Sequence, residues 1–181
     1  MLGVKSRAAR ARPAAGLAPD SLRAECCGLR RAIPPDEKDA VMNTFHTESQ
    51  IALRMRRVDD PDRIHVLPRH FGRIMLVVEN AIYFWAGKLS PDYRGGFWTF
   101  YEFGEGGFYM APDNEAFRVQ VEGNGFEGTL SADAFGITCC LFAFSHLSFA
   151  VDHSALGRHY GLLREFACEH AEAGLIAQAI D

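Results

Sequence analysis

The sequence predicts an α+β fold: a single domain in which an antiparallel β-meander of about four short strands packs with three to four α-helices. Three observations support this class. Short aromatic or alternating segments are separated by glycine-containing turns between residues 97 and 130. A long apolar segment precedes them, and apolar segments with helical spacing follow them. The chain has 181 residues, 48% of them hydrophobic, which is enough for one buried core.

The first 41 residues differ from the rest of the chain. They are rich in Arg and Ala, contain Pro13 and Pro19, and show neither helical nor strand periodicity. Their net charge is +3, whereas residues 42–181 have a net charge of −7. We expect residues 1–41 to form a disordered N-terminal extension, of the kind that a translation start upstream of the natural one would add. The folded domain is then expected to span residues 42–181.

The first helix is expected at Phe71–Leu89. A turn-rich segment around Asp59–Asp62 and Pro68 should precede it, because proline and clustered polar residues favour turns. The helical segment is apolar on most sides, so we expect it to be buried on most of its surface. Glu79 in its middle argues against a membrane span.

Four strands should follow this helix. Glycines separate the first two strands, and Asn124-Gly125 provides a tight turn between the last two. The third segment alternates apolar and polar residues, as expected for a strand with one buried face. The expected strands are Phe97–Phe103, Gly107–Ala111, Phe117–Glu122 and Phe126–Leu130. Consecutive hairpin connections predict that they form one meander.

Helices are expected to complete the chain. Ser131 occupies an N-cap position, and Asp133 lies in the first turn of the helix that follows. Eighteen residues without a formal charge separate Asp133 from Asp152, but regularly spaced polar residues predict a buried core helix and no membrane span. That stripe is Ser131, Thr138, Ser145 and Asp152, with Ser148 beside it. The apolar face of the next helix should contain Leu156, Tyr160, Leu163, Phe166 and Ala167. Ala171–Ile180 should form a short last helix.

No catalytic or metal-binding pattern emerges. The histidines lack the spacing that places two ligands on one helical face, so we expect solvated or core histidines, no metal and no cofactor. Cys139 and Cys140 lie in the middle of an apolar helix, where burial raises a thiol pKa, and core packing is the better interpretation. The Gly104–Gly107 run joins two strands and lacks the lysine of a nucleotide-binding loop.

Acidic residues dominate the strand region. Eight acids and two bases lie between Asp92 and Asp133, which argues against general nucleic-acid binding. Solvated strand faces are the favoured explanation, and weak imitation of DNA is an alternative. Another alternative is a small enzyme that uses Glu102, Glu127 or Asp133 on a nucleotide or DNA intermediate.

Aromatic residues are concentrated in the same region. Eight of them fall within seventeen positions, between Tyr93 and Tyr109. Either helices cover both faces of the sheet, or one face presents an aromatic patch to a protein partner. Core packing is slightly favoured, because aromatic residues fill small cores efficiently.

Several motifs resemble those of the ArdB/KlcA-type antirestriction family. The densest are the run Tyr93–Glu102, the run Gly106–Pro112, and Gly123–Phe126 followed by Leu130–Ile137. Weaker similarity includes Leu67-Pro68 and Phe71–Arg73 upstream, and Tyr160–Ala167 and Glu169–Asp181 downstream. The similarity spans roughly residues 64–181 in order, and residues 1–41 have no counterpart.

The resemblance implies a non-enzymatic protein of plasmids and other mobile elements that relieves Type I restriction of incoming DNA in the bacterial cytoplasm. We expect action through a protein surface on the Type I restriction-modification system, by direct or indirect contact. We expect no direct nucleic-acid binding, no membrane association, and a monomer or weak dimer. The candidate interaction surface, chosen for its motif density, consists of Tyr93, Trp98, Tyr101, Glu102, Tyr109, Asn124 and Asp133.

Overall fold

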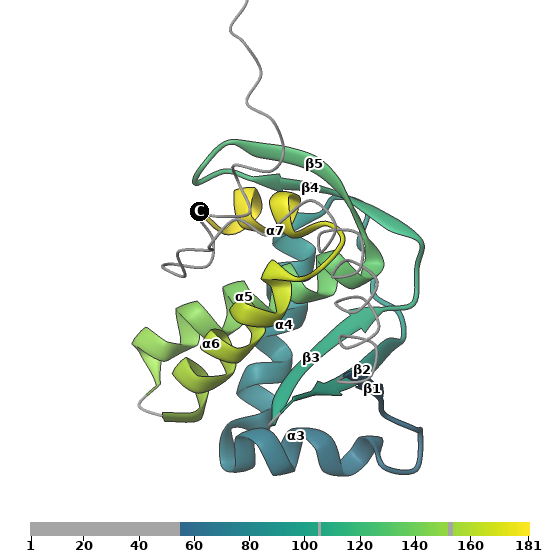
Figure 1. Ribbon diagram of the computed structural model, residues 1–181, viewed down its shortest axis with the longest axis vertical. Helices are drawn as coiled ribbons and strands as arrows, with labels where there is room; N and C mark the ends of the chain where they lie inside the picture. The colour runs from purple at the N-terminus through teal and green to yellow at the C-terminus, as the bar shows by residue number, and fades with distance from the viewer. Residues whose placement is uncertain (1–54, 105, 152–153) are drawn as a thin grey trace, which may run out of the picture.

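The computed structural model describes residues 55–104, 106–151 and 154–181 (Figure 1). The predicted N-terminal extension, and the first residues of the predicted domain, lie outside the described residues. The described elements, in chain order, are β1 (Met55–Arg57), α3 (Arg63–Phe71), the 3-10 helix η1 (Gly72–Ile74), α4 (Met75–Leu89), β2 (Trp98–Phe103), β3 (Gly107–Pro112), β4 (Ala116–Val121), β5 (Phe126–Ser131), α5 (Ala132–Ala150), α6 (Ser154–Cys168) and α7 (Ala173–Ile180).

The strands form two small antiparallel sheets. One has the order β1-β2-β3, and the other pairs β4 with β5. The α+β class and the four predicted strands are therefore confirmed, but the prediction of one continuous meander is wrong, since β3 and β4 do not pair. Each hairpin is instead extended by one backbone bond: the Asp113 N–H donates to the Phe97 carbonyl at 2.9 Å beside the β2–β3 pair, and the Ala132 N–H to the Glu115 carbonyl at 3.2 Å beside the β4–β5 pair. The short strand β1 was not predicted.

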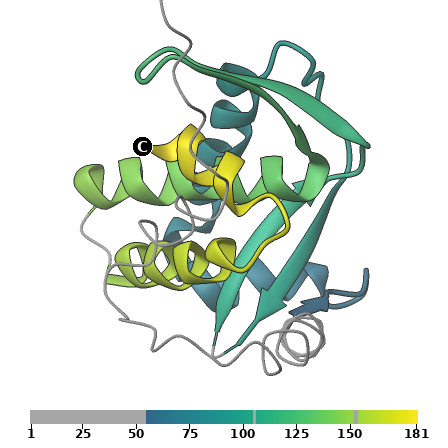
Figure 2. The same cartoon turned by 45° about the horizontal axis from the view of Figure 1, so that its top comes forward.

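Helix α5 occupies the centre of the domain. It contacts α4, α6 and α7 as well as β3, β4 and β5. The two hairpins lie along one side of the helices, with β4–β5 near α7 and β2–β3 extending towards α3 (Figures 1 and 2). Contact with β3 is especially close at Gly136, where an added Cβ would lie 2.5 Å from the Met110 carbonyl oxygen. The glycine therefore sets how closely the central helix approaches the sheet.

The single helix predicted at Phe71–Leu89 is two helices. Gly72 has a φ of +50°, a left-handed conformation that favours glycine, and it separates α3 from α4. Pro68, predicted to mark a turn, lies inside α3. Proline removes one backbone donor and leaves the carbonyl four residues earlier, that of Ile64, without its helical bond.

Only one side of α4 is buried. Val78, Ile82 and Ala86, spaced four residues apart, are fully covered, whereas Leu76 and Phe84 are 60% and 62% exposed. The prediction that most of this helix surface is buried is therefore wrong. An apolar sequence predicts burial only on the side that other elements cover, and α4 packs mainly against α3, η1, α5 and β4, with a ring contact between its Tyr83 and Trp98 of β2.

The predicted start of α5 is confirmed, since the Ser131 side chain accepts a hydrogen bond from the Ala134 N–H. The predicted polar stripe is only partly correct: Ser148 is exposed, but Thr138 is buried and its hydroxyl donates to the Ala134 carbonyl at 2.8 Å. Asp152 lies outside the described residues. Among the described helices, α5 alone is long and apolar enough to cross a membrane, and 56% of its most apolar window is buried within the domain.

The last two helices agree closely with prediction. In α6, Leu156, Leu163 and Ala167 are buried as expected, while Tyr160 and Phe166 are half-buried. His159 also belongs to the buried face, where its ring contacts Phe71 and Phe144. Helix α7 begins two residues later than predicted.

Core packing explains most of the aromatic concentration. Five of the eight aromatic residues between positions 93 and 109 are buried, and Tyr93 and Tyr101 are half-buried. The buried ones are Trp98, Phe100, Phe103, Phe108 and Tyr109. Phe97 is exposed, and the Arg63 guanidinium lies 4.1 Å from the centre of its ring. The alternative of a broad aromatic surface is therefore not favoured.

Candidate functional site

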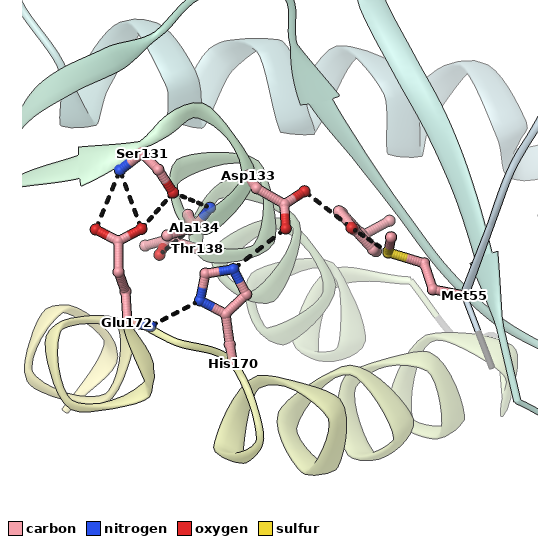
Figure 3. A network of polar contacts seen from close by, with 8 residues as sticks. Met55, Ser131, Asp133, Ala134, Thr138, His170 and Glu172 are labelled. Carbon is pink, nitrogen blue, oxygen red and sulfur yellow. Dashed lines mark hydrogen bonds and ion pairs between the residues drawn. The ribbon is translucent and has the colours of Figure 1, made fainter. Parts of the chain in front are cut away.

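A chain of polar contacts surrounds the first turn of α5 (Figure 3). We call it the Asp133 network, and its members are Tyr109, Ser131, Asp133, His170 and Glu172. The buried Tyr109 hydroxyl donates to Asp133 Oδ1 at 2.8 Å and lies 3.0 Å from the Met55 sulfur. The other carboxylate oxygen, Asp133 Oδ2, is 3.2 Å from His170 Nε2. The network thus joins β3 to the start of α5 and to the loop before α7.

The tautomer of His170 follows from the hydrogen bonds that its two ring nitrogens make. The Glu172 backbone N–H donates to His170 Nδ1 at 3.0 Å, so this nitrogen must be an acceptor. The ring proton of the neutral tautomer is then on Nε2, from which it is donated to Asp133. The Glu172 carboxylate in turn accepts hydrogen bonds from the Ser131 hydroxyl and N–H. Every polar group of the network therefore has a partner suited to it, as expected of a structural clamp.

Tyr109 is the most deeply buried member. Burial, followed by the nearby Asp133 carboxylate, raises its pKa far above the ordinary value. Its ring stacks on Tyr101, with centroids 4.8 Å apart and planes 12° from parallel. Tyr109 thus remains a neutral hydrogen-bond donor at physiological pH, which suits support of Asp133 better than proton transfer to a substrate.

A second group of charged residues surrounds Glu102 on β2. We call it the Glu102 cluster, and its members are Arg56, Arg69, His70 and Glu102. Arg56 donates to Glu102 Oε2 at 2.7 Å, His70 Nε2 lies 2.8 Å from Oε1, and Arg69 also contacts Oε1. Burial opposes ionisation of Glu102, but the hydrogen bonds from His70, Arg56 and Arg69 outweigh it and lower its pKa to about 2.

An open cavity of about 690 Å³ lies beside the Glu102 cluster. Its lining comes from β1, the end of α3, the hairpin between β2 and β3, and the start of α6. Among the described lining residues, Glu102 is the only carboxylate, and three are arginines: Arg56, Arg69 and Arg158. The arrangement can bind an anion, and among its described residues there is no pair of converging carboxylates of the kind that the hydrolytic alternative would need.

Comparisons with known proteins agree with this architecture and these motifs. A family model described as "Antirestriction protein" matches residues 91–181. The antirestriction protein KlcA of Escherichia coli is 47% identical over 133 residues, which cover 69% of this chain and 91% of KlcA. The chain belongs to the antirestriction protein family. The uncharacterised protein YafX of Escherichia coli K12 is 36% identical over 139 residues, covering 74% of this chain and 91% of YafX.

A solved structure of this family has the same fold. It is described as a structure of the KlcA and ArdB proteins and matches with a TM-score of 0.64 and 41% identity. The match covers 70% of this chain and 94% of that chain. Those proteins are described as having a novel fold and antirestriction activity against Type I DNA restriction systems in vivo but not in vitro.

The residues predicted as one interaction surface of this family member occupy different environments. Trp98 and Tyr109 are 1% and 0% exposed, so they support the domain from its interior and do not lie on its surface. Trp98 Nε1 donates to the hydroxyl of the half-buried Tyr93 at 3.0 Å. The Asn124 amide donates to the Gln178 carbonyl at 2.9 Å and so holds the β4–β5 turn against α7.

The remaining predicted residues divide between two faces of the β2–β3 hairpin. Neighbouring residues of a strand point to opposite faces, so Tyr101 and Glu102 diverge. Tyr101 shares its face with Tyr109, which contacts Asp133. Glu102 instead faces His70 on α3. Tyr101 and Asp133 therefore remain candidates for a common surface, while Glu102 belongs to the cavity on the other side.

Several residues of both sites were absent from the sequence prediction. Arg56, Arg69 and His70 precede the first helix that the sequence predicted, and His170 had no metal-like spacing. Their partners lie 32 to 46 residues away along the chain, so no local pattern could have joined them. Within the described part of the chain, no group of three His, Cys, Asp or Glu side chains could hold a metal ion.

Cys139 and Cys140 pack in the core, as predicted. Both are fully buried, and burial raises the pKa of each thiol, to about 12 for Cys140. The Cys140 thiol lies 3.7 Å from the Met110 carbonyl oxygen. Neither cysteine is a candidate nucleophile, since the reactive form of cysteine is the thiolate.

Proposed function

We propose that this chain relieves Type I restriction of incoming DNA in the bacterial cytoplasm, acting as a non-enzymatic inhibitor through a protein surface. The observation behind this proposal is the similarity to the KlcA and ArdB structure, which extends over 94% of that chain at 41% identity. The activity described for those proteins against Type I systems in vivo is the activity that we propose here. Its reported absence in vitro suggests that a further cellular component is needed.

The electrostatics of the chain support action on protein over imitation of DNA. A DNA mimic needs closely spaced unpaired negative charges, about one per 1.7 Å of helix axis. Here Asp92 forms an ion pair with Arg118, and its pKa is lowered to about 2 by hydrogen bonds from that residue. Glu102 is likewise bonded to two arginines. Two of the acids in the acidic stretch are thus neutralised by local partners.

The surface that we propose lies around Tyr101 and Asp133, on one face of the β2–β3 hairpin. Tyr101 is half-buried and the Asp133 side chain is 37% exposed, so both can contact a partner. Packing of Tyr101 against Tyr109 fixes the ring in one orientation before a partner arrives. Immobilised aromatic rings with an accessible edge are common at the centre of protein interfaces.

The test of the function is relief of restriction in cells. Unmodified phage should plate more efficiently on a bacterial strain with a Type I system when the strain expresses this chain than when it contains an empty vector. Unchanged plating, with the protein soluble and folded, would overturn the proposed function. Capture of the restriction complex by the tagged chain from the same cells would distinguish direct from indirect contact.

The surface requires a separate test. Tyr101→Lys should abolish most of the relief, because it places a charge where a partner would pack, while Gln120→Lys on the exposed side of β4 serves as a matched control. Both variants are compared by circular dichroism and thermal unfolding. A folded Tyr101→Lys variant with full relief would exclude this surface and leave the function itself intact.

A further inference from the structure

The turn between β4 and β5 contains a pair of residues that is prone to spontaneous chemical change. Asn124 is the only one of the four asparagines in the chain that precedes a glycine. The main-chain nitrogen that follows an asparagine can attack its side-chain amide, and glycine has no side chain to hinder that attack. Asn124 and Gly125 are both exposed, so water can reach the product of the attack. The sequence thus makes Asn124 the asparagine of this chain most prone to deamidation.

Deamidation replaces the Asn124 side-chain amide by a carboxylate. The main-chain nitrogen of Gly125 loses its proton and forms a bond to Asn124 Cγ. The bond from Cγ to Nδ2 breaks, and Nδ2 leaves as ammonia with the displaced proton. Water then opens the resulting cyclic imide at either of its carbonyl carbons and leaves aspartate or isoaspartate. The reaction consumes water and releases ammonia, so it needs no partner other than solvent.

Contacts with α7 hold the Asn124 side chain in a position where it cannot react. Its Nδ2 donates to the Gln178 carbonyl at 2.9 Å and to the Ala179 carbonyl at 3.3 Å. Its Oδ1 accepts a hydrogen bond from the Phe126 N–H at 3.0 Å. The amide can turn its Cγ towards the next main-chain nitrogen only after these bonds break. Docking of α7 therefore protects the amide.

The attacking nitrogen is also held in the folded domain. The Gly125 N–H donates to the Val121 carbonyl at 2.9 Å, and this bond retains the proton that the attack must remove. The bonds that the amide makes to α7 can break while most of the domain stays folded, because α7 is an eight-residue helix at the end of the chain. The rate of deamidation should then follow the population of chains in which α7 has left the turn.

The product cannot restore the contact with α7. A carboxylate accepts hydrogen bonds and donates none, and the groups that it would face, the Gln178 and Ala179 carbonyls, are acceptors too. Ala179 is buried, so its carbonyl would lose a partner where water is partly excluded. Isoaspartate in addition lengthens the main chain of the turn. A chain that reacts while α7 is undocked is therefore hindered from closing again.

We propose that Asn124 is a modification site at which deamidation converts a transient opening of α7 into a permanent loosening of the domain. The site is a one-way switch, since the intact amide stabilises the docked helix and the carboxylate opposes it. The strength of the α7 contact then determines how long a copy of this chain keeps its native form. The proposal concerns the stability of the domain and is independent of its activity.

The first experiment follows deamidation of the full chain at mildly alkaline pH, which favours the reactive deprotonated amide. Mass spectrometry of digested peptides would measure the fraction of each asparagine converted, in native buffer and in urea. We expect Asn124 to react at least about tenfold more slowly in the folded chain than in urea. Asn114, which precedes Glu115, should stay unchanged in both conditions. Equal rates at Asn124 in buffer and in urea, or no reaction in urea, would overturn the proposal.

Matched variants separate the opening of α7 from unfolding of the whole domain. Ile176→Val trims a buried side chain of α7, and Ile82→Val makes the same change at a buried position of α4. Both changes are small enough for the chain to fold. In Ile176→Val, we expect deamidation of Asn124 and amide exchange in α7 to accelerate by the same factor, about two- to tenfold. Equal acceleration of deamidation in Ile82→Val would show that the reaction follows global unfolding and would overturn control by α7.

The last experiment tests whether the product keeps α7 from docking. Asn124→Asp places the carboxylate in the turn, and Asn114→Asp adds the same charge in the bend between β3 and β4 as the matched control. Amide exchange in α7 should be about tenfold faster or more in Asn124→Asp than in the wild-type chain, and unchanged in Asn114→Asp. Wild-type protection of the α7 amides in Asn124→Asp would overturn the one-way switch.

Discussion

Substitution of Gly136 by alanine tests the packing of the central helix on the sheet. Gly136 lies in the second turn of α5, where alanine would ordinarily stabilise a helix by about 1 kcal/mol over glycine. In this position the new Cβ would lie 2.5 Å from the Met110 carbonyl oxygen and 2.6 Å from Ala111 Cα. These are backbone atoms of β3, which cannot rotate away as the end of a flexible side chain could.

The loss of unfolding free energy expected for Gly136→Ala follows from the distance that α5 must move away from β3. Ordinary contact begins near 3.4 Å, so α5 and β3 would have to separate by roughly 0.9 Å, enough to forfeit a quarter to a half of the dispersion energy of each affected contact. Overpacking of this kind costs about 1 to 3 kcal/mol. Because the overlap is with backbone, we expect a cost of about 3 kcal/mol, and a net loss of about 2 kcal/mol after the helical gain.

Urea unfolding followed by circular dichroism would measure the effect on the free energy of unfolding. Gly161→Ala is the matched control: it makes the same change inside α6, where no atom lies within 4 Å of the new Cβ. We expect the control to be neutral or up to about 1 kcal/mol more stable than the wild-type chain. If Gly136→Ala were as stable as the control, the account of the α5–β3 contact would be wrong.

Three further predictions concern hydrogen bonds and burial. The folded-state pKa of Glu102 lies below its ordinary value of 4.5. Its ionised form therefore stabilises the fold above pH 4.5, and this contribution is lost as the pH falls towards 2. The difference in unfolding free energy between the wild-type chain and Glu102→Gln should shrink over the same pH range. Asn124→Ala should destabilise the domain by about 1 to 2 kcal/mol, because it removes the bonds to the Gln178 carbonyl and the Phe126 N–H, and faster amide exchange in α7 would report it. Cys139 and Cys140 should resist iodoacetamide at pH 7.5 in the folded chain and react with it in urea, because both thiols are buried. Mass spectrometry of the digested peptides would measure the labelling. Rapid labelling without denaturant would contradict their burial.

The parts of the fold that could be predicted from sequence are those specified by local patterns. Gly125, with a φ of +73°, lies in the turn that the Asn-Gly pair indicated, and the Ser131 cap marks the start of α5 within one residue. The alternation in β4 is reproduced in its burial, with Phe117, Val119 and Val121 inside. Each of these signals is complete within a few residues of sequence.

The fold prediction was wrong where contacts with a segment distant in sequence determine the local structure. The apolar sequence of α4 does not show which side another element will cover, so the helix was expected to be buried on most of its surface, whereas residues such as Phe84 are exposed. Pro68 indicates a turn in most settings, but here it lies inside a short helix. The strands fall into two sheets because β3 pairs with β2 and β4 pairs with β5, and the patterns of the individual strands do not show that β3 and β4 stay unpaired.

The candidate sites were predictable to a smaller extent for the same reason. Motif density drew attention to Asp133 and Glu102, and each of them lies at the centre of a group of polar contacts. It also selected Trp98 and Tyr109, whose role in the structure is to fill the core. Dense motifs thus indicate regions that matter to the protein. The exposed fraction of each side chain and its contacts in the structure are needed to tell a residue that packs in the core from one that can bind a partner.

The contacts of Glu172 and Gln178 have a consequence for the order in which the domain can form during translation. A ribosome makes the aromatic hairpins and α5 before it makes the residues that clamp them, because His170 and Glu172 bind the start of α5 and the Gln178 carbonyl binds the β4–β5 turn. Until α7 emerges from the exit tunnel, the first turn of α5 and the Asn124 amide lack these partners. A nascent chain whose α7 has not yet docked is therefore more open to proteases and chaperones than the folded domain.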